Sequence, residues 1–349
     1  NTGFLSENEK PKKAELFSRW VRGNFFIPDA RKFWIKPSIK YLKKHLNEHP
    51  VDVIVSTGPP HSMHLIAKGI AKETKTPWLA DFRDPWTNID FYEELMLTTG
   101  ADQKHHKLEK AVCDSADALL VIGPTMKKEF EVISPQSKIH IVPNGFDPSD
   151  QLTIDQVPLD KKFTIAHIGS FSPSRNVPVL WEALSEVCNE NPEFKDQLLI
   201  KLVGKVDHVV LSSIQQAGLQ NNIEKTPYLQ HDEVTAVQRS SQVLLLIANN
   251  TKNAKGILTG KVFEYLAADR PILAIGPEDG DLAKLLEEVN GNPIIDYLNK
   301  TEMKAAMRKF FLLYQQEALQ ADHRNISNFS REELSSQLSA ILTELINSK

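Results

Sequence analysis

The sequence predicts an α/β protein built from two domains in tandem, each with a parallel sheet and helices on both of its faces. Three observations support this prediction. The chain has 349 residues, a length that suits two domains of roughly 150 residues each. Short apolar runs alternate with segments of helical periodicity, as they do in parallel sheets. The alternation stops at a polar, turn-rich segment, 143–161, and then restarts.

The N-terminal half opens with aromatic and basic residues interleaved at helical spacing over 12–49. Two interpretations of this segment stay open: contact with a membrane surface, and one or two helices docked on their own domain with a solvated basic face. We favour the second. The following pattern predicts strands at 51–55, 78–80, 118–122 and 139–142, and helices at 62–74, 102–114 and 124–131.

The C-terminal half repeats this alternation. The predicted strands are 163–168, 198–203, 223–228, 242–248 and 272–275. The predicted helices are 177–190, 208–218, one beginning at 260, 281–289, 301–318 and 331–347. The resulting domains are 1–155 and 156–330, followed by a final helical segment, 331–349. Ligands of such sheets bind outside the carboxyl ends of the strands, so the gap between the domains is the expected site.

Composition excludes several classes of protein. The net charge of −4 argues against a nucleic-acid partner, and no apolar run is long enough to span a membrane. Cys113 and Cys188 form no CxxC pair or Cys/His cluster, which fits a reducing cytosol and gives no zinc site. There is no GxGxxG after a strand, no GxxxxGK[ST] and no GxSxG, so dinucleotide oxidoreductases, P-loop enzymes and α/β-hydrolases are disfavoured.

The most informative segment is the strand–loop–helix–strand unit around 243–275. Gly260 and Lys261 stand at the predicted start of its helix, and Glu264 follows one turn later. Free backbone amides and a cation at a helix start attract phosphate, and a carboxylate one turn on can accept hydrogen bonds from sugar hydroxyls. Together these groups suit a nucleotide whose diphosphate and ribose lie across one helix end.

Other predicted strand ends carry weaker candidates. In the C-terminal half these are Gly169 with Arg175, Gly204, and the segment 228–231, which contains Leu229. In the N-terminal half they are His61, Asp81 and Asp84. An ordinary turn with an exposed arginine, a loop histidine and a salt-bridged turn are the structural alternatives for these residues.

The motifs resemble those of glycosyltransferases with the GT-B fold, which has two Rossmann-like domains, and are most similar to family 4. The resemblance spans about 51–347 and rests on PNGFD at 143–147, HIGSF at 167–171, LVG at 202–204 and GKVFEYLA at 260–267. The segment DFRDPW at 81–86 is similar to bacterial surface-polysaccharide transferases. The resemblance implies that the first family strand and its glycine-rich turn precede residue 1, so we expect an incomplete N-terminal domain. It also implies that helix 331–347 packs back on that domain.

Residue by residue, the resemblance assigns Glu264 to the ribose hydroxyls and Gly260 and Lys261 to the diphosphate, and the neighbouring Val262 is also expected at the donor site. Arg175 matches one cation of the family's diphosphate clamp. Two positions depart from the pattern: Ser170 and Asn176 stand where the clamp usually has an arginine and a lysine, and Gly256 replaces the first glutamate of E-x7-E, which contacts the donor sugar.

The resemblance therefore implies a retaining, metal-independent transfer of a hexose-type sugar to a glycan or lipid-linked glycan, with no cofactor beyond the nucleoside diphosphate sugar. Asp84 or Asp81 would orient the acceptor. The implied location is the cytoplasm, either free or at the inner face of the membrane. Two alternatives stay open: a nucleotide-sugar epimerase of the same fold and a degenerate, non-catalytic binding subunit.

Overall fold

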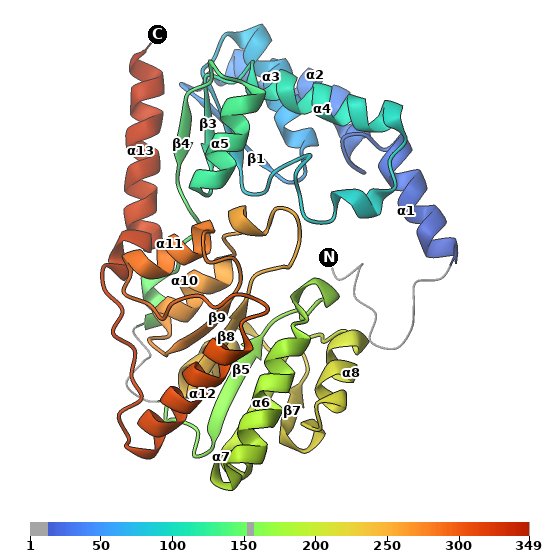
Figure 1. The fold of residues 1–349 in the computed structure, drawn as a ribbon. Helices are drawn as coiled ribbons and strands as arrows, with labels where there is room; N and C mark the ends of the chain where they lie inside the picture. The colour runs from blue at the N-terminus through green and yellow to red at the C-terminus, as the bar shows by residue number, and fades with distance from the viewer. Residues whose placement is uncertain (1–12, 152–156, 349) are drawn as a thin grey trace. The chain divides into compact units, whose positions relative to one another are not determined.

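The computed structural model describes residues 13–151 and 157–348, which divide into two compact units (Figure 1). The described residues up to Pro143, together with those from Glu333 onward, form the first unit, here called the N-terminal domain. The second, the C-terminal domain, begins at Asn144 and ends at Glu332. The start of the predicted first domain, 1–12, and the predicted boundary at 155–156 lie outside the described residues or at their edge.

The N-terminal domain contains a parallel sheet with the strand order β1-β2-β3-β4. These strands are β1 (Ile54–Gly58), β2 (Trp78–Phe82), β3 (Ala118–Val121) and β4 (Ile139–Ile141). Its helices are α1 (Lys13–Phe25), α2 (Ile35–Glu48), α3 (Ser62–Thr74), α4 (Thr99–Cys113) and α5 (Pro124–Ile133). Strands β2 and β3 are buried throughout, as expected where helices cover both faces of a sheet.

The last helix, α13 (Arg331–Asn347), contributes to the core of the N-terminal domain (Figure 1). Its buried Leu334 and Leu345 share a cluster with Leu79, Leu120 and Val142. This helix therefore carries an apolar stripe that is covered by strands formed more than 200 residues earlier in the chain.

The C-terminal domain contains a second parallel sheet, with the order β7-β6-β5-β8-β9. The strands are β5 (Phe163–Ile168), β6 (Leu198–Val203), β7 (Ile223–Thr226), β8 (Val243–Ile247) and β9 (Ile272–Ile275). The helices are α6 (Pro178–Glu190), α7 (Pro192–Gln197), α8 (His208–Gln216), α9 (His231–Ser240), α10 (Gly260–Ala267), α11 (Asp281–Glu288) and α12 (Lys300–Gln315). The predicted α/β class with two parallel sheets is confirmed.

The strand order creates a switch point between β5 and β8. The chain first builds outward from β5 to β6 and β7, and then returns to place β8 and β9 on the other side of β5. The connections that follow β5 and β8 consequently diverge, and open α/β sheets bind ligands in the crevice that such divergence leaves at the carboxyl ends of the strands.

Several predicted elements are wrong in position or were missed. The first strand was predicted at 51–55, but β1 runs from Ile54 to Gly58 and alternates between exposed and buried residues. The strand predicted to reach Tyr228 ends at Thr226. Two helices, α7 and α9, were not predicted. Both are short and polar and are fixed by capping, α9 through reciprocal bonds between Gln230 and Glu233.

Candidate functional site

Gly169 and Lys261 meet at the switch point of the C-terminal sheet. Gly169 directly follows β5 and has a φ of +103°, and a Cβ added to it would lie 2.9 Å from both Cε and Nζ of Lys261. Lys261 belongs to the first turn of α10, which begins after the loop that follows β8. The lysine therefore crosses the switch point and ends against the backbone at the end of β5.

Gly204 completes this close approach from the neighbouring strand. It follows β6 with a φ of +105°, and a Cβ added to it would lie 3.1 Å from the carbonyl carbon and oxygen of Gly169. L-residues rarely adopt such dihedral angles, so glycine is required at both positions. The backbones of Gly169 and Gly204 and the side chain of Lys261 are thus packed together beyond the carboxyl ends of β5 and β6.

The ammonium group of Lys261 is held in a low-dielectric setting. Its Nζ is buried and has no hydrogen-bond partner. Burial is the main cause that lowers the pKa of Lys261 to about 7, Arg175 lowers it further by repulsion, and Glu264 opposes both. A buried, unpartnered cation beside a second cation favours an anion as ligand, because an opposite charge would offset the cost of burial.

Arg175 is a second positive charge near Lys261, and both cations affect the protonation of the neighbouring His167. The Arg175 guanidinium donates a hydrogen bond from Nη1 to the carbonyl of Ser170, at 2.8 Å. His167 is buried and stacks on Phe171, with ring centroids 4.1 Å apart. Burial, Lys261 and Arg175, in that order, hold the pKa of His167 well below its usual range. The neutral histidine therefore adds no third charge to the site.

Helix α10 presents its start and one carboxylate at the same end of the domain. Thr259 is the N-cap residue but provides no side-chain cap, and a Cβ on Gly260 would meet nothing within 4 Å. Glu264 is exposed and accepts a hydrogen bond of 3.3 Å from Nε2 of Gln238. Open space therefore lies beside the first residue of α10, at the end of the helix where backbone amides attract anions.

The other face of α10 fixes it to β5. Tyr265 is fully buried, and its hydroxyl accepts a hydrogen bond of 3.1 Å from the backbone N–H of Ile168, the last residue of β5. Val262 is also fully buried, and its backbone N–H donates to the carbonyl of Thr259, so the structure gives Val262 no direct part at a ligand. Sequence reasoning missed Tyr265, although its place beside Glu264 in an apolar helix face was a usable signal.

The remaining predicted donor-side residues lie on separate loops. Gly256 ends the short 3-10 helix at Ala254–Gly256, where its N–H donates to the carbonyl of Asn253. Leu229 is half-buried in the connection between β7 and α9. Asn176 donates to Ser213 Oγ and accepts from Trp181 Nε1, bonds that tie it to α8 and α6.

In the N-terminal domain, the two candidate carboxylates differ: Asp81 is buried and ion-paired, whereas Asp84 is exposed. Asp81 is buried, accepts a hydrogen bond from Thr57 and forms a close ion pair with Arg83, whose Nη2 lies 2.6 Å from Oδ1. Arg83 also donates to the carbonyl of Val142. Asp84 is exposed as a residue, yet partial burial and the charge of Asp90 raise the pKa of its carboxyl to about 6, against the opposing effect of Arg83.

His61 lies beneath this loop, stacked on an aromatic ring. Its imidazole is parallel to Trp86, with the ring centroids 4.6 Å apart, and its Nδ1 is buried without a hydrogen-bond partner. Burial lowers the pKa of His61 to about 4, although the charge of Asp29 opposes this. His64 is wholly buried nearby and shares a hydrogen bond with Ser56 Oγ. The histidine is therefore neutral and packed at ordinary pH.

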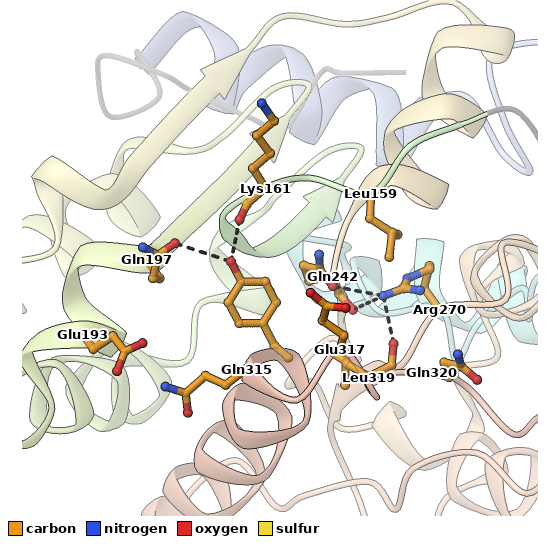
Figure 2. Close-up of a pocket in the computed structure, with 11 residues that line it drawn as sticks. Leu159, Lys161, Glu193, Gln197, Gln242, Arg270, Gln315, Glu317, Leu319 and Gln320 are labelled. Carbon is orange, nitrogen blue, oxygen red and sulfur yellow. Dashed lines mark hydrogen bonds between the residues drawn. The ribbon is translucent and has the colours of Figure 1, made fainter.

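A separate pocket of about 650 Å³ is shown in Figure 2. It is lined by Gln242 and Arg270, which precede β8 and β9, so it opens at the amino ends of these strands, whereas Lys261 lies at the end of β5. Its buried cation, Arg270, donates to three backbone carbonyls, those of Ser241, Gln242 and Leu319. Arg270 thus joins the starts of two strands to the segment after α12. None of the predicted site residues lines this pocket.

Within 13–151 and 157–348 there is no cluster of three or more histidine, cysteine or acidic residues that could hold a metal ion. In the same part of the chain, every helix is too short or too polar to cross a membrane.

Comparisons with known proteins give one family match in the N-terminal part and several similar folds over most of the chain. Residues 4–150 match the family model of Glycosyltransferase Family 4, and the sequence has no significant match among curated proteins. The fold is similar to sucrose-phosphate synthase from Thermosynechococcus elongatus, with a TM-score of 0.66 and 13% identity over 92% of this chain and 80% of that chain.

It is also similar to a UDP-forming α,α-trehalose-phosphate synthase from Burkholderia xenovorans in complex with glucose-6-phosphate, with a TM-score of 0.60 and 13% identity over 96% of this chain and 78% of that one. A trehalose-6-phosphate structure from E. coli bound with UDP-2-fluoro glucose gives a TM-score of 0.60 and 10% identity over 98% and 88%. Identities this low establish the fold alone. The fold of the chain is therefore GT-B, and residues 4–150 are similar to Glycosyltransferase Family 4.

Proposed function

We propose that the protein transfers a sugar from a nucleoside diphosphate sugar to a hydroxyl of a glycan or lipid-linked glycan, with retention of configuration and without a metal ion. The observation that carries this proposal is the buried, unpartnered ammonium of Lys261 against Gly169 at the switch point. Two structural neighbours support the donor class, since one is named as UDP-forming and another is bound with UDP-2-fluoro glucose.

The chemistry of the donor side follows from charge. When the bond between the sugar and the diphosphate breaks, negative charge develops on the leaving phosphate oxygen. Lys261, Arg175 and the amides at the start of α10 would stabilise that charge, and preorganised cations in a dry site do so strongly. These groups supply the electrostatic stabilisation that a metal ion would otherwise provide, so the proposed reaction needs none.

The acceptor side needs an orienting group rather than a strong base. In a same-face displacement, the departing phosphate oxygen takes up the acceptor proton as the new glycosidic bond forms. Asp84 is the carboxylate we assign to acceptor orientation, since Asp81 is already paired with Arg83. With a pKa of about 6, Asp84 would be ionised at neutral pH and would accept a hydrogen bond from the acceptor hydroxyl.

Calorimetry with UDP, GDP, ADP, CDP and TDP tests the donor site. We expect one of these ligands to bind the full chain, and Lys261→Met to weaken that binding by at least about tenfold, the effect of losing one charge-assisted contact. Lys284→Met, which removes an exposed lysine on α11, is the matched control and should leave the affinity unchanged. Failure of all five ligands to bind, or equal effects of the two substitutions, would contradict the proposal.

A second pair of variants tests the ribose contact. Glu264→Ala should weaken binding of the same nucleoside diphosphate, whereas Glu288→Ala, an exposed glutamate in α11, should not. Incubation of the nucleotide sugar without acceptor then separates transfer from epimerisation, because only an epimerase changes the sugar of the free donor. A changed sugar under these conditions would replace the transferase proposal.

A further inference from the structure

The exposed aromatic side chains of the protein are concentrated in its first two helices. Among the described residues, six aromatic side chains are exposed, and five of them lie between positions 17 and 41; the sixth is Tyr228. The five have exposed fractions of 59–69% and are Phe17, Phe25, Phe33, Trp34 and Tyr41. A random scatter of surface aromatics would not gather in this way, and contiguous exposed apolar groups mark interaction sites.

Basic residues accompany these rings. Between Arg31 and Lys44 there are six lysines and arginines and no acidic residue, although the whole chain carries a net charge of −4. Arg31, Lys36, Lys40 and Lys44 are exposed. We call these four cations, with the five aromatic residues, the aromatic–basic face.

The packing of α2 explains why this face points outward. The half-buried Ile35, Ile39, Leu42 and Leu46 recur at helical spacing, and α2 packs on α3, where Ile39 lies so close to Gly69 that a Cβ there would overlap it. This apolar stripe packs on α3. Trp34 and Tyr41 are seven residues apart and therefore lie together on another side of the helix. Lys36, Lys40 and Lys44 are spaced four apart and form their own row.

The end of α1 joins the start of α2 into the same surface. The Lys32 ammonium donates a hydrogen bond to the carbonyl of Phe25 and lies 4.9 Å from the centroid of the Phe33 ring. Phe26 packs edge-on against Phe33, with centroids 6.1 Å apart. Lys32 consequently links the last residue of α1 to the ring of Phe33, so the end of α1 is held beside the segment that leads into α2.

The chemistry of this surface matches an anionic membrane. Aromatic rings settle at the level of lipid headgroups, and lysine and arginine side chains bind the headgroup phosphates. A stacking platform for nucleic acid would also use rings and cations, but exposed phenylalanines and the exposed Leu16, which precedes Phe17, suit insertion between acyl chains. We propose that the aromatic–basic face docks the protein on a membrane surface that carries anionic lipids, with the helices lying in the plane of the interface.

Co-sedimentation of the full chain with lipid vesicles tests this proposal. We expect binding to vesicles of phosphatidylcholine mixed with phosphatidylglycerol, little binding to phosphatidylcholine alone, and weaker binding at high salt. The triple variant Lys36→Glu/Lys40→Glu/Lys44→Glu should lose at least about tenfold in affinity, since each basic residue near such a surface contributes roughly fivefold. Its matched control is Lys104→Glu/Lys107→Glu/Lys128→Glu, which makes the same charge change in α4 and α5 of the same domain and should bind as the wild type.

The aromatic part is tested separately. Trp34→Ala/Tyr41→Ala should weaken vesicle binding, and Tyr228→Ala should not; because all these side chains are exposed, the circular dichroism and melting temperature of each variant should match those of the wild type. Three results would overturn the proposal: absence of binding to the mixed vesicles, equal losses in the variants and their controls, or a change of oligomeric mass in Trp34→Ala/Tyr41→Ala that shows the face to join two copies of the chain. None of these measurements depends on donor binding, so they are independent of the proposed function.

Discussion

Lys261 ends against Gly169, 92 positions earlier in the chain, at a distance that leaves no room for a side chain at the glycine. The contact joins the start of α10 to the end of β5 at the point where the strand order of the C-terminal sheet reverses. The glycine thus determines where the ammonium of the lysine lies, and the lysine determines the charge at the switch point.

Gly169→Ala should therefore damage both stability and donor binding. The new methyl group would displace the flexible end of Lys261 and so weaken donor binding. A φ of +103° is strained for alanine, so we expect a loss of about 1–3 kcal/mol in the free energy of unfolding. Urea unfolding measures the first effect and nucleoside diphosphate calorimetry the second. Gly100→Ala is the control, because a methyl group there has nothing within 4 Å and alanine favours the helix. Wild-type stability in Gly169→Ala would contradict this account.

Donor affinity should depend on the protonation of Lys261. With a pKa of about 7 in the free protein, the lysine is charged below neutral pH and loses its charge as the pH rises. Both phosphates of a nucleotide sugar stay ionised over this range, so we expect affinity to fall above pH 7 by as much as about tenfold per pH unit. Calorimetry at several pH values checks this in the wild type. Lys261→Met should bind weakly with no such slope, and a persistent slope in that variant would assign the titration to another group.

The sequence predicted most of the C-terminal sheet well because its inner strands and β9 are mainly buried and apolar, unlike the edge strand β7. Strands β5, β6 and β9 begin and end at the predicted residues. Strand β1 is different: it is at the edge of its sheet, and Val55 is exposed while Ser56 is buried. Ser56 is accommodated by hydrogen bonds to His64 and Trp78. Those partners are tertiary, so the apolar pattern placed the strand three residues too early.

The sequence likewise predicted only the local part of the candidate site. Motif spacing identified Gly260, Lys261 and Glu264 because they belong to one helix. It could not show that Lys261 would be buried against Gly169, since that contact depends on where separate segments meet. The salt-bridged turn that stayed open as an alternative for Asp81 is local, and the ion pair with Arg83 confirms it. The prominence of Phe33, Trp34 and Tyr41 was visible in the sequence, but their exposure depends on which stripe of α2 packs on α3.

Tyr265→Phe should destabilise the C-terminal domain without changing its charge. The tyrosine hydroxyl is the acceptor for the backbone N–H of Ile168 in a fully buried setting, and its removal leaves that N–H unsatisfied. We expect a loss of about 1–3 kcal/mol in unfolding free energy, measured by urea denaturation. Tyr228→Phe removes the hydroxyl of a tyrosine that is 87% exposed and should have no effect. Equal effects in the two variants would refute the role assigned to this hydrogen bond.

The N-terminal domain should lose stability in mild acid because it buries neutral histidines. Burial lowers the pKa of His61 to about 4 and that of His64 to about 3, whereas both would titrate near 6.5 in the unfolded chain. Their depressed values mean that stability is fully present above about pH 6.5 and declines as the pH falls toward 4, by about 1.4 kcal/mol per pH unit for each histidine. Urea unfolding followed by tryptophan fluorescence between these pH values measures the slope.

The variant His61→Phe removes one of these two titrating histidines and so measures its contribution to the pH dependence of stability. Phenylalanine keeps an aromatic ring against Trp86, and the Nδ1 atom that it removes has no hydrogen-bond partner, so the domain should remain folded at neutral pH. The pH slope should then fall by the contribution of one histidine, whereas His49→Phe, at an exposed position, should retain the full slope. An unchanged slope in His61→Phe would mean that His61 is protonated at the same pH in the folded and unfolded chain, and that its burial carries no proton linkage.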